Sequence, residues 1–311
     1  MPGLVTTTAL EWIAGVKRVK HVRIGFSPPW VNKLVIACAV VIFAAAPNGG
    51  RMAVAEAVSH DRIDRVDVDG TALQVRLNSG RILQGRDLEG ATLAIVLPGK
   101  RQPQRIRIDS IAPDPMDPEG EILLYRIRVL DSAPGKSEEL CGPDPQGERW
   151  AFPLRGQWDS NGSHISDEGF TLTCSSGAQG KCLRFGYKPW RSLPDGVSLA
   201  DYHQACIRLV RAAYCRFHGT TRDGVQIDIY DRVGIQGPAD GAIQKGLHFE
   251  AAWNAKGAVC VSHTRVPAKM TLKRLGEVCP RLRGYLGKAA CTAERAESGE
   301  LGAVLLYNRS R

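Results

Sequence analysis

The sequence SLADYHQACIRLVRAAYC, residues 198–215, decides the fold of the C-terminal half of this chain. Its apolar side chains recur at the spacing of one helix face, and two arginines fall on the other face. The apolar face holds Tyr202, Cys206, Leu209, Val210 and Ala213, and the polar face holds Arg208 and Arg211. The first four residues have the pattern of a capping box, in which Ser198 and Asp201 satisfy free amides at a helix start. We therefore expect an amphipathic helix that begins near Ser198 and organises the elements around it.

Two cysteines of this stretch connect the helix to the rest of the domain. Cys206 and Cys215 are nine residues apart, which is about 900° around a regular helix and about 13 Å along its axis. They face opposite ways and are too far apart for a mutual disulfide. Each must therefore bond to another element, unless the helix ends before Cys215.

The cysteines of the whole chain are concentrated in its C-terminal half. Nine occur, and only Cys38 lies near the N-terminus. The other eight are Cys141, Cys174, Cys182, Cys206, Cys215, Cys260, Cys279 and Cys291. In an exported protein this even number predicts a disulfide framework, whose pairing the sequence does not choose. Free thiols or a metal site are the alternatives, but structural zinc sites place cysteines two to four residues apart. No two cysteines here are that close, so we expect four disulfides, no metal and no cofactor.

Short strands are expected on both sides of the helix. Apolar and polar residues alternate over 73–77, 105–108 and 122–130, which is the pattern of half-buried strands. Residues 170–174 and 181–190 also have the composition of strands. The predicted fold is therefore α+β, mostly β, with one central helix in a small disulfide-bonded domain and a β-strand module before it.

The predicted module and domain meet near residue 135, where residues 131–137 form a small, polar stretch with Pro134 and Gly135. We assign 56–134 to the cysteine-free module and 135–311 to the cysteine-rich domain. Within the module, residues 79–93 repeat the form x-G-x-x-L three times. Such a repeat is typical either of a pentapeptide-like coil or of a meander with Gly turns. Three pentads do not complete a coil, which favours the meander.

The N-terminal segment has the pattern of a secretory signal. Basic residues within 17–33 precede an apolar run over 34–46, and sites of the A-x-A type follow. We expect residues 1–55 to be a signal peptide with an extended leader, cleaved after Ala55 or Ala57. An uncleaved anchor is the alternative, but a membrane span needs about 20 apolar residues. Membrane contact should therefore be transient.

The chain's positive charge is largely a property of this leader. The formal charge of the chain is +9, and the first 55 residues hold six bases and one acid, so the remainder carries +4. This charge is ordinary for a chain of that length, so we expect no nucleic-acid partner.

Several motifs, in order, resemble the ADYC domain, a family of exported bacterial proteins named for an Ala-Asp-Tyr-Cys motif. They occur at 181–190, 202–206, 211–215 and 221–236, and residues 249–260 and 302–306 look like later strands of the family. The resemblance covers about 140–308. This chain departs from the motif itself, because Ala213 stands where the family has Asp. The resemblance implies a fold and export, and it implies no particular activity.

Three residues are candidates for catalysis. His203 precedes Cys206 by three residues, but a thiol mechanism needs a free thiolate, and an exported cysteine is expected in a disulfide. A buried, hydrogen-bonded His203 is the favoured interpretation. Asp228 and Asp231 on the strand after Asp223 offer carboxylates for glycoside hydrolysis or for calcium, and a solvated strand face with Arg partners is the simpler interpretation.

Large aromatic side chains suggest a further kind of site. Trp150, Trp158, Trp190 and Trp253 are candidates for a carbohydrate platform, although tryptophans in small domains are more often core.

The sequence thus leads to two functional hypotheses. The favoured one is an exported, non-catalytic binding or structural protein of the bacterial envelope or exterior, with a cell-surface glycan or protein as partner. The alternative is an extracellular hydrolase that uses His203 with Asp228 or Asp231. A hydrolase requires the histidine and a carboxylate to converge in one open cleft.

Overall fold

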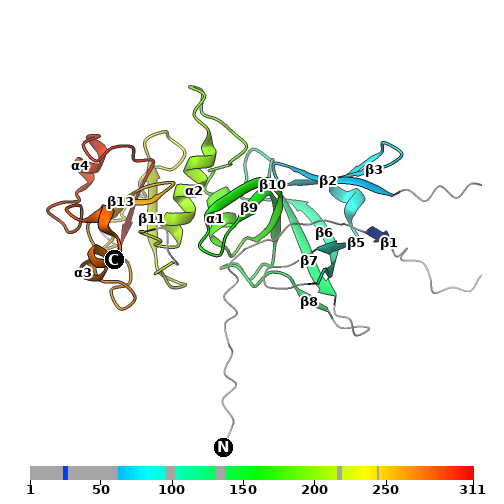
Figure 1. The fold of residues 1–311 in the computed structure, drawn as a ribbon, viewed down its shortest axis with the longest axis horizontal. Helices are drawn as coiled ribbons and strands as arrows, with labels where there is room; N and C mark the ends of the chain where they lie inside the picture. The colour runs from blue at the N-terminus through cyan, green and yellow to red at the C-terminus, as the bar shows by residue number, and fades with distance from the viewer. Residues whose placement is uncertain (1–23, 27–61, 96–101, 131–136, 216–218, 244) are drawn as a thin grey trace, which may run out of the picture.

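The computed structural model describes residues 24–26, 62–95, 102–130, 137–215, 219–243 and 245–311 (Figure 1). The proposed cleavage sites, most of the predicted signal segment and most of the predicted linker around residue 135 lie outside these residues. Strand β1 (Ile24–Phe26) is the one described piece of the signal segment, and it pairs with β5.

The largest sheet has seven antiparallel strands in the order β1-β5-β6-β7-β9-β10, with β8 paired to β7. These strands are β5 (Ala91–Ile95), β6 (Gln104–Pro113), β7 (Leu123–Leu130), β8 (Ser137–Glu139), β9 (Ala151–Trp158) and β10 (His164–Cys174). Alternate residues of β5 are buried, as period-two patterning requires. Because β7 pairs with strands on the far side of residue 135, this sheet runs across the predicted boundary, and the division into two domains stays a prediction.

A smaller sheet covers part of the large one. It has the order β2-β3-β4, formed by β2 (Ile63–Asp69), β3 (Ala72–Leu77) and β4 (Ile82–Gln84). Its inward side chains, such as Val75, share a core with Leu88 and Ile106. A 3-10 helix, η1 (Gly85–Leu88), leads from β4 to β5, so the repeat at 79–93 contributes to two different sheets.

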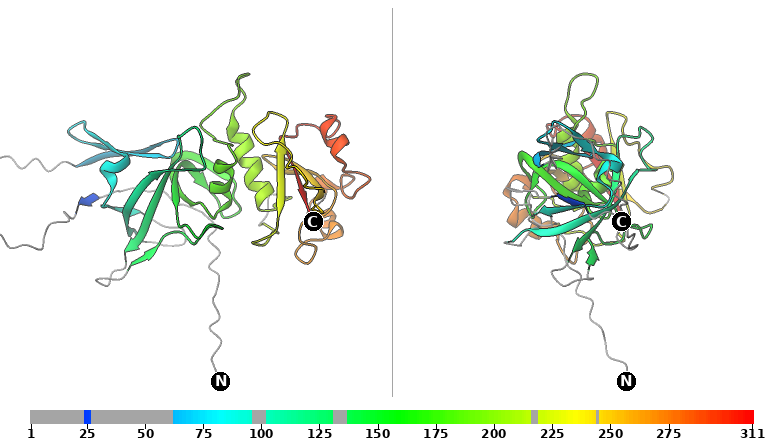
Figure 2. Two further views of the ribbon diagram at one scale, coloured as in Figure 1. Left: turned by 180° about the vertical axis from the view of Figure 1, so that it is seen from behind. Right: turned by 90° about the vertical axis from the view of Figure 1, so that its right-hand side faces the viewer.

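The third sheet lies at the C-terminal end. Its order is β11-β14-β12-β13, formed by β11 (Ile227–Asp231), β12 (His248–Asn254), β13 (Gly257–Val261) and β14 (Leu306–Ser310). Helix α2 (Leu199–Val210) lies between this sheet and the large one (Figure 2). One apolar core joins the three layers, with Phe152 from β9, Ile207 from α2 and Trp253 from β12. The helix predicted from residues 198–215 is therefore the central element.

Helix α2 is shorter than its apolar pattern suggests. Ser198 Oγ accepts the backbone N–H of Ala200, which confirms the predicted start. Ala212 has a left-handed φ of 50°, and the N–H of Ala213 returns to the carbonyl of Arg208. This left-handed turn and its hydrogen bond satisfy carbonyls at the C-terminal end of the helix, and the helix ends before Cys215.

Three shorter helices accompany α2, namely α1 (Ala178–Arg184), α3 (Leu272–Val278) and α4 (Ala293–Glu297), with a 3-10 turn η2 (Pro280–Leu282). The strand predicted over 181–190 is wrong, because α1 occupies its first part. Gly180 lets this helix approach β10: a Cβ there would lie 2.4 Å from the carbonyl oxygen of Cys174. Close tertiary packing therefore overrides the strand-like composition.

All eight predicted cysteines form disulfides. The pairs are Cys141–Cys174, Cys182–Cys206, Cys215–Cys279 and Cys260–Cys291. Cys206 and Cys215 have different partners, as the helix geometry required. Four disulfides indicate an oxidising, extracellular environment. Across the described ranges, no helix is long and apolar enough to cross a membrane.

A buried ion pair supports the C-terminal sheet. The Arg265 guanidinium binds the Glu250 carboxylate at 3.0 Å, and both side chains are almost completely buried. Tyr214 Oη and Asn308 Nδ2 donate further hydrogen bonds to the same carboxylate. Burial alone would raise the pKa of Glu250, but Arg265, with hydrogen bonds from Ser310 and Tyr214, holds that pKa below its usual value.

Candidate functional site

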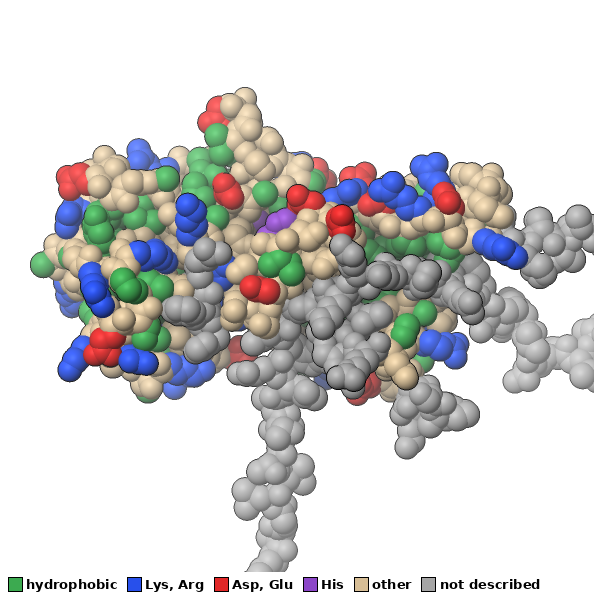
Figure 3. All heavy atoms as spheres, in the orientation of Figure 1, with side chains coloured by type: hydrophobic (Ala, Val, Ile, Leu, Met, Phe, Trp, Pro, Cys, Tyr) green, Lys and Arg blue, Asp and Glu red, His purple; other side chains and the backbone are tan. Residues whose placement is uncertain are grey.

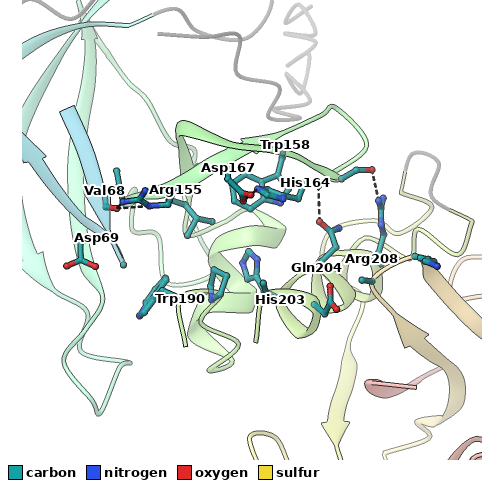
Figure 4. Close-up of a pocket in the computed structure, with 18 residues that line it drawn as sticks. Val68, Asp69, Arg155, Trp158, His164, Asp167, Trp190, His203, Gln204 and Arg208 are labelled. Atoms are coloured by element: carbon teal, nitrogen blue, oxygen red, sulfur yellow. Dashed lines mark hydrogen bonds and ion pairs between the residues drawn. The ribbon is translucent and has the colours of Figure 1, made fainter. Parts of the chain in front are cut away.

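A cavity of about 490 Å³ lies where the β2–β3 hairpin meets the layers around α2 (Figure 4). Its wall comes from five parts of the chain: the hairpin tip, strands β9 and β10 with their connection, the loop after α1, the first turns of α2, and the β12–β13 turn. The aromatic, charged and amide side chains of this wall include Arg155, Trp158, His164, Asp167, Trp190, Asp201, His203, Gln204 and Arg208.

Trp158 forms the floor of the cavity. Its side chain is buried, its ring centroid is 4.8 Å from that of His164, and it meets the His203 ring edge-on at 6.2 Å. The indole N–H of Trp158 is buried and has no hydrogen-bond partner among the described residues. Leaving such a donor unpaired costs about 1–3 kcal/mol. This nitrogen has almost no accessible surface, so the N–H itself is not offered to a ligand, and Trp158 contributes its ring to the cavity wall.

His164 lies beside this indole because the strand opposite it contains a glycine. Gly156 has a left-handed φ of 94°, and a Cβ there would lie 2.6 Å from His164 Nε2. Any larger residue would displace the imidazole. The ring also approaches the Asp167 carboxylate, with 3.4 Å between Nε2 and Oδ1. This places one carboxylate and one imidazole at the exposed rim of the cavity.

His203 contributes a second, buried imidazole from α2. Its Nε2 is 3.4 Å from the carbonyl oxygen of Gln179. Burial, with a smaller contribution from His164, lowers the pKa of His203 to about 4. His203 is therefore neutral at physiological pH and offers hydrogen bonds without a charge. The prediction of a buried, hydrogen-bonded histidine agrees with this geometry.

The first turns of α2 hold the β9–β10 connection in place. Gln204 accepts the backbone N–H of His164 at 2.9 Å and donates to the carbonyl of Gly162 at 2.8 Å. Arg208 donates to Ser163 Oγ at 2.5 Å and to the carbonyl of Asn161 at 3.0 Å. The wall that carries His164 is thus fixed by the helix.

The opposite wall is the tip of the β2–β3 hairpin. Arg155 donates to the carbonyl of Val68 at 2.9 Å and pairs with Asp67 at the same distance. Gly70, with a φ of 57°, lies against the Trp190 ring, and a Cβ there would be 3.3 Å from Cε2. The hairpin and Trp190 therefore close one side of the cavity together.

The structure separates the three predicted catalytic residues. His203 lines the cavity, whereas Asp228 and Asp231 are not part of its wall. Asp228 accepts the N–H of Ala239 and pairs with Arg309. Asp231 accepts the Tyr187 hydroxyl at 2.8 Å and the N–H groups of the following loop. The expected solvated strand face is wrong for Asp228, which is buried beside its Arg partner.

The four tryptophans have different roles. Trp158 and Trp190 line the cavity. Trp253 is core, with its N–H donated to Asn308 Oδ1 at 2.7 Å, and Trp150 packs under the Arg126 guanidinium. Sequence reasoning did not single out Asp167 and Gln204 as site residues, since their place at the cavity depends on how β10 and α2 pack together. In the parts of the chain that the structure covers, no group of three or more His, Cys, Asp or Glu side chains has the arrangement of a metal site.

The fold and this cavity define a disulfide-bonded, β-rich protein with a ligand-sized cavity beside its central helix. The family model of the ADYC domain matches residues 85–267, and the chain therefore belongs to the ADYC domain family. The match begins earlier than the sequence motifs indicated and includes β5, β6 and β7. Comparison with curated proteins and with solved structures gives no match.

Proposed function

We propose that this chain is an exported, non-catalytic binding protein of the bacterial envelope or exterior, and that its cavity binds a sugar unit of a cell-surface glycan. The observation that carries the proposal is a cavity of about 490 Å³ whose wall combines the rings of Trp158 and Trp190 with polar side chains. Small-ligand sites are typically about 300–1,000 Å³.

The chemistry of the wall favours a sugar. Trp158 and Trp190 supply flat apolar surfaces, and Asp201, His203 and Asp167 supply hydrogen-bonding groups around them. A sugar ring has an apolar face and a rim of hydroxyls, each able to donate and accept, so one ring can match both parts of the wall. Of the cations in the wall, Arg155 is paired with Asp67 and Arg208 donates to Asn161 and Ser163. The wall also carries Asp69, Asp167 and Asp201, which favours a neutral sugar over an anionic one.

A non-catalytic role is supported by the positions of the acidic side chains. A hydrolase would use His203 with Asp228 or Asp231, and these two carboxylates bind other groups outside the cavity wall. No observation at the cavity favours that alternative, so binding is the function we propose.

The binding proposal is tested by titrating the disulfide-intact chain with a panel of neutral bacterial glycans by calorimetry. We expect Trp158→Phe, which shrinks one aromatic surface of the wall, and Trp190→Ala, which removes the other, each to weaken binding at least about tenfold, equivalent to about 1.4 kcal/mol. Trp150→Phe is the matched control, because Trp150 packs under Arg126 outside the cavity wall. Binding that is equally strong in all three variants, or no binding across the panel, would overturn the proposal.

The export part of the proposal has its own test. Non-reducing mass spectrometry of the protein from its host should give a chain that starts at Glu56 or Val58 and has no free thiol. An intact leader with reactive thiols would contradict export.

A further inference from the structure

Beyond the cavity, the segment 269–288 carries a strong local charge. It contains six bases and one acid, a formal charge of +5, whereas the whole chain after residue 55 carries only +4. The remainder of the exported chain is therefore nearly neutral. The bases are Lys269, Lys273, Arg274, Arg281, Arg283 and Lys288, and all six are exposed. We call them the α3 basic surface, and Figure 3 shows Lys and Arg side chains gathered over the end of the molecule that carries α3.

The fold holds these cations in fixed positions. Cys279 and Cys291 anchor the segment to Cys215 and Cys260 through disulfides. Three of the cations also donate to backbone carbonyl oxygens, which fixes their side chains without neutralising them. Lys269 binds the carbonyl of Thr221, Arg283 that of Gly276, and Arg281 those of Ala258 and Tyr214. The acid of the segment, Glu277, pairs with Arg274.

Preordered cations lose little side-chain entropy when an anion binds, so such a surface suits a polyanion. The oxidising environment indicated by the disulfides argues against nucleic acid. A membrane surface is disfavoured as well, because membrane-binding elements combine basic residues with an apolar face. Among the described residues of this segment, Tyr285 is the one large apolar side chain that is exposed. We propose that the α3 basic surface binds an anionic polysaccharide.

This surface also reaches the cavity. Arg281 donates to the carbonyl of Lys256, and Lys256 belongs to the cavity wall. A polysaccharide chain bound along α3 would therefore lie next to the site proposed for a sugar unit. Binding of the polyanion does not depend on the cavity, so the two proposals are tested separately.

The test measures binding of the disulfide-intact chain to polygalacturonate, with uncharged dextran as reference. We expect affinity for polygalacturonate that falls steeply with salt. The variant Lys273→Gln/Arg274→Gln/Lys288→Gln should weaken it at least about tenfold. The matched control is Arg62→Gln/Arg81→Gln/Arg86→Gln, which removes the same charge from exposed positions of the N-terminal part and should change affinity less than about twofold.

Three results would overturn the proposal. Equal losses in both triple variants would show a net-charge effect without a site. Tighter binding to phosphatidylglycerol vesicles than to polygalacturonate would identify a membrane surface instead. Unchanged binding in the α3 variant would place the anion elsewhere.

Discussion

The N-terminal strands and the C-terminal layers of this protein are stabilised in different ways. Residues 62–130 build a core of aliphatic side chains such as Leu73, Val75 and Ile106, and this stretch contains no cysteine. The C-terminal layers add three of the four disulfides and the fully buried Glu250–Arg265 pair to their apolar core, whereas Cys141–Cys174 borders the aliphatic core. Apolar burial depends little on redox state or pH. Disulfides respond to redox state, and buried charges respond to pH. The two regions should therefore unfold under different conditions.

Charged groups also join the two regions. Lys188, which follows α1, binds Asp117 at 2.8 Å in the loop before β7 and also pairs with Glu119 and Glu121. Burial alone would lower the pKa of Lys188, but these three carboxylates raise it above its usual value. The loop before β7 is thus an electrostatic contact with the C-terminal part, buried at Lys188 and Asp117.

The largest effect should come from breaking the buried ion pair. Glu250→Ala leaves the Arg265 guanidinium buried without its carboxylate, so the free energy of unfolding should fall by about 3–5 kcal/mol. Urea unfolding followed by far-ultraviolet circular dichroism measures this loss. Glu250→Leu/Arg265→Met is the control, because removing both charges should restore most of the stability. A double variant as unstable as Glu250→Ala would contradict the explanation.

Next in size is the loss of the disulfide between α1 and α2. Cys182→Ala/Cys206→Ala opens a loop with a sequence separation of 24 and should lower the free energy of unfolding by about 3 kcal/mol. Hydrogen exchange should show the loss first in α1 and α2. Protection lost equally in β3 and β6 would mean that the two regions do not differ as described.

Acid should destabilise the C-terminal layers through His203. The pKa of His203 is lowered to about 4 in the folded protein, from 6.5. Below pH 6.5 the unfolded chain binds a proton that the folded chain does not. The free energy of unfolding therefore decreases as the pH is lowered from about 6.5 to about 4. The loss should be about 2 kcal/mol at pH 5. The stability of His203→Phe, measured by thermal unfolding, should not show this decrease between pH 6.5 and pH 4. An unchanged decrease would assign the pH dependence to other groups.

The smallest effect should come from the helix cap. Ser198→Ala removes the side chain that accepts the N–H of Ala200 and should cost about 1 kcal/mol. Ser198→Asp, which keeps a capping oxygen, should stay within about 0.5 kcal/mol of the parent protein. If both variants lose the same stability, the hydroxyl has another role.

The sequence predicts the fold better where physical constraints are local. Period-two alternation is enough to predict β3 and β6, and apolar spacing with a cap is enough to predict α2. The strand expected at 181–190 fails because α1 depends on its contact with β10 and on a disulfide to α2. The end of α2 also depends on one left-handed residue, Ala212, which composition does not reveal.

The candidate site is less predictable because distant segments build it. His203 and four tryptophans were candidates from the sequence, and the cavity contains His203 and two of these tryptophans, Trp158 and Trp190. Asp228 and Asp231 were candidates because they share a strand, but tertiary contacts direct them to Arg309 and Tyr187. The hairpin wall next to Trp190 has no sequence motif, since it depends on how two sheets pack.

The most direct test of the proposed site observes the Trp158 indole N–H by nitrogen-15 NMR, with Trp158→Phe used to assign its resonance. Addition of the tightest-binding glycan of the panel should shift this resonance, because the Trp158 ring belongs to the cavity wall. The indole resonance of Trp253, whose N–H is already donated to Asn308, should stay unchanged. A Trp158 resonance that does not move at saturating glycan would contradict the assignment of this cavity as the binding site.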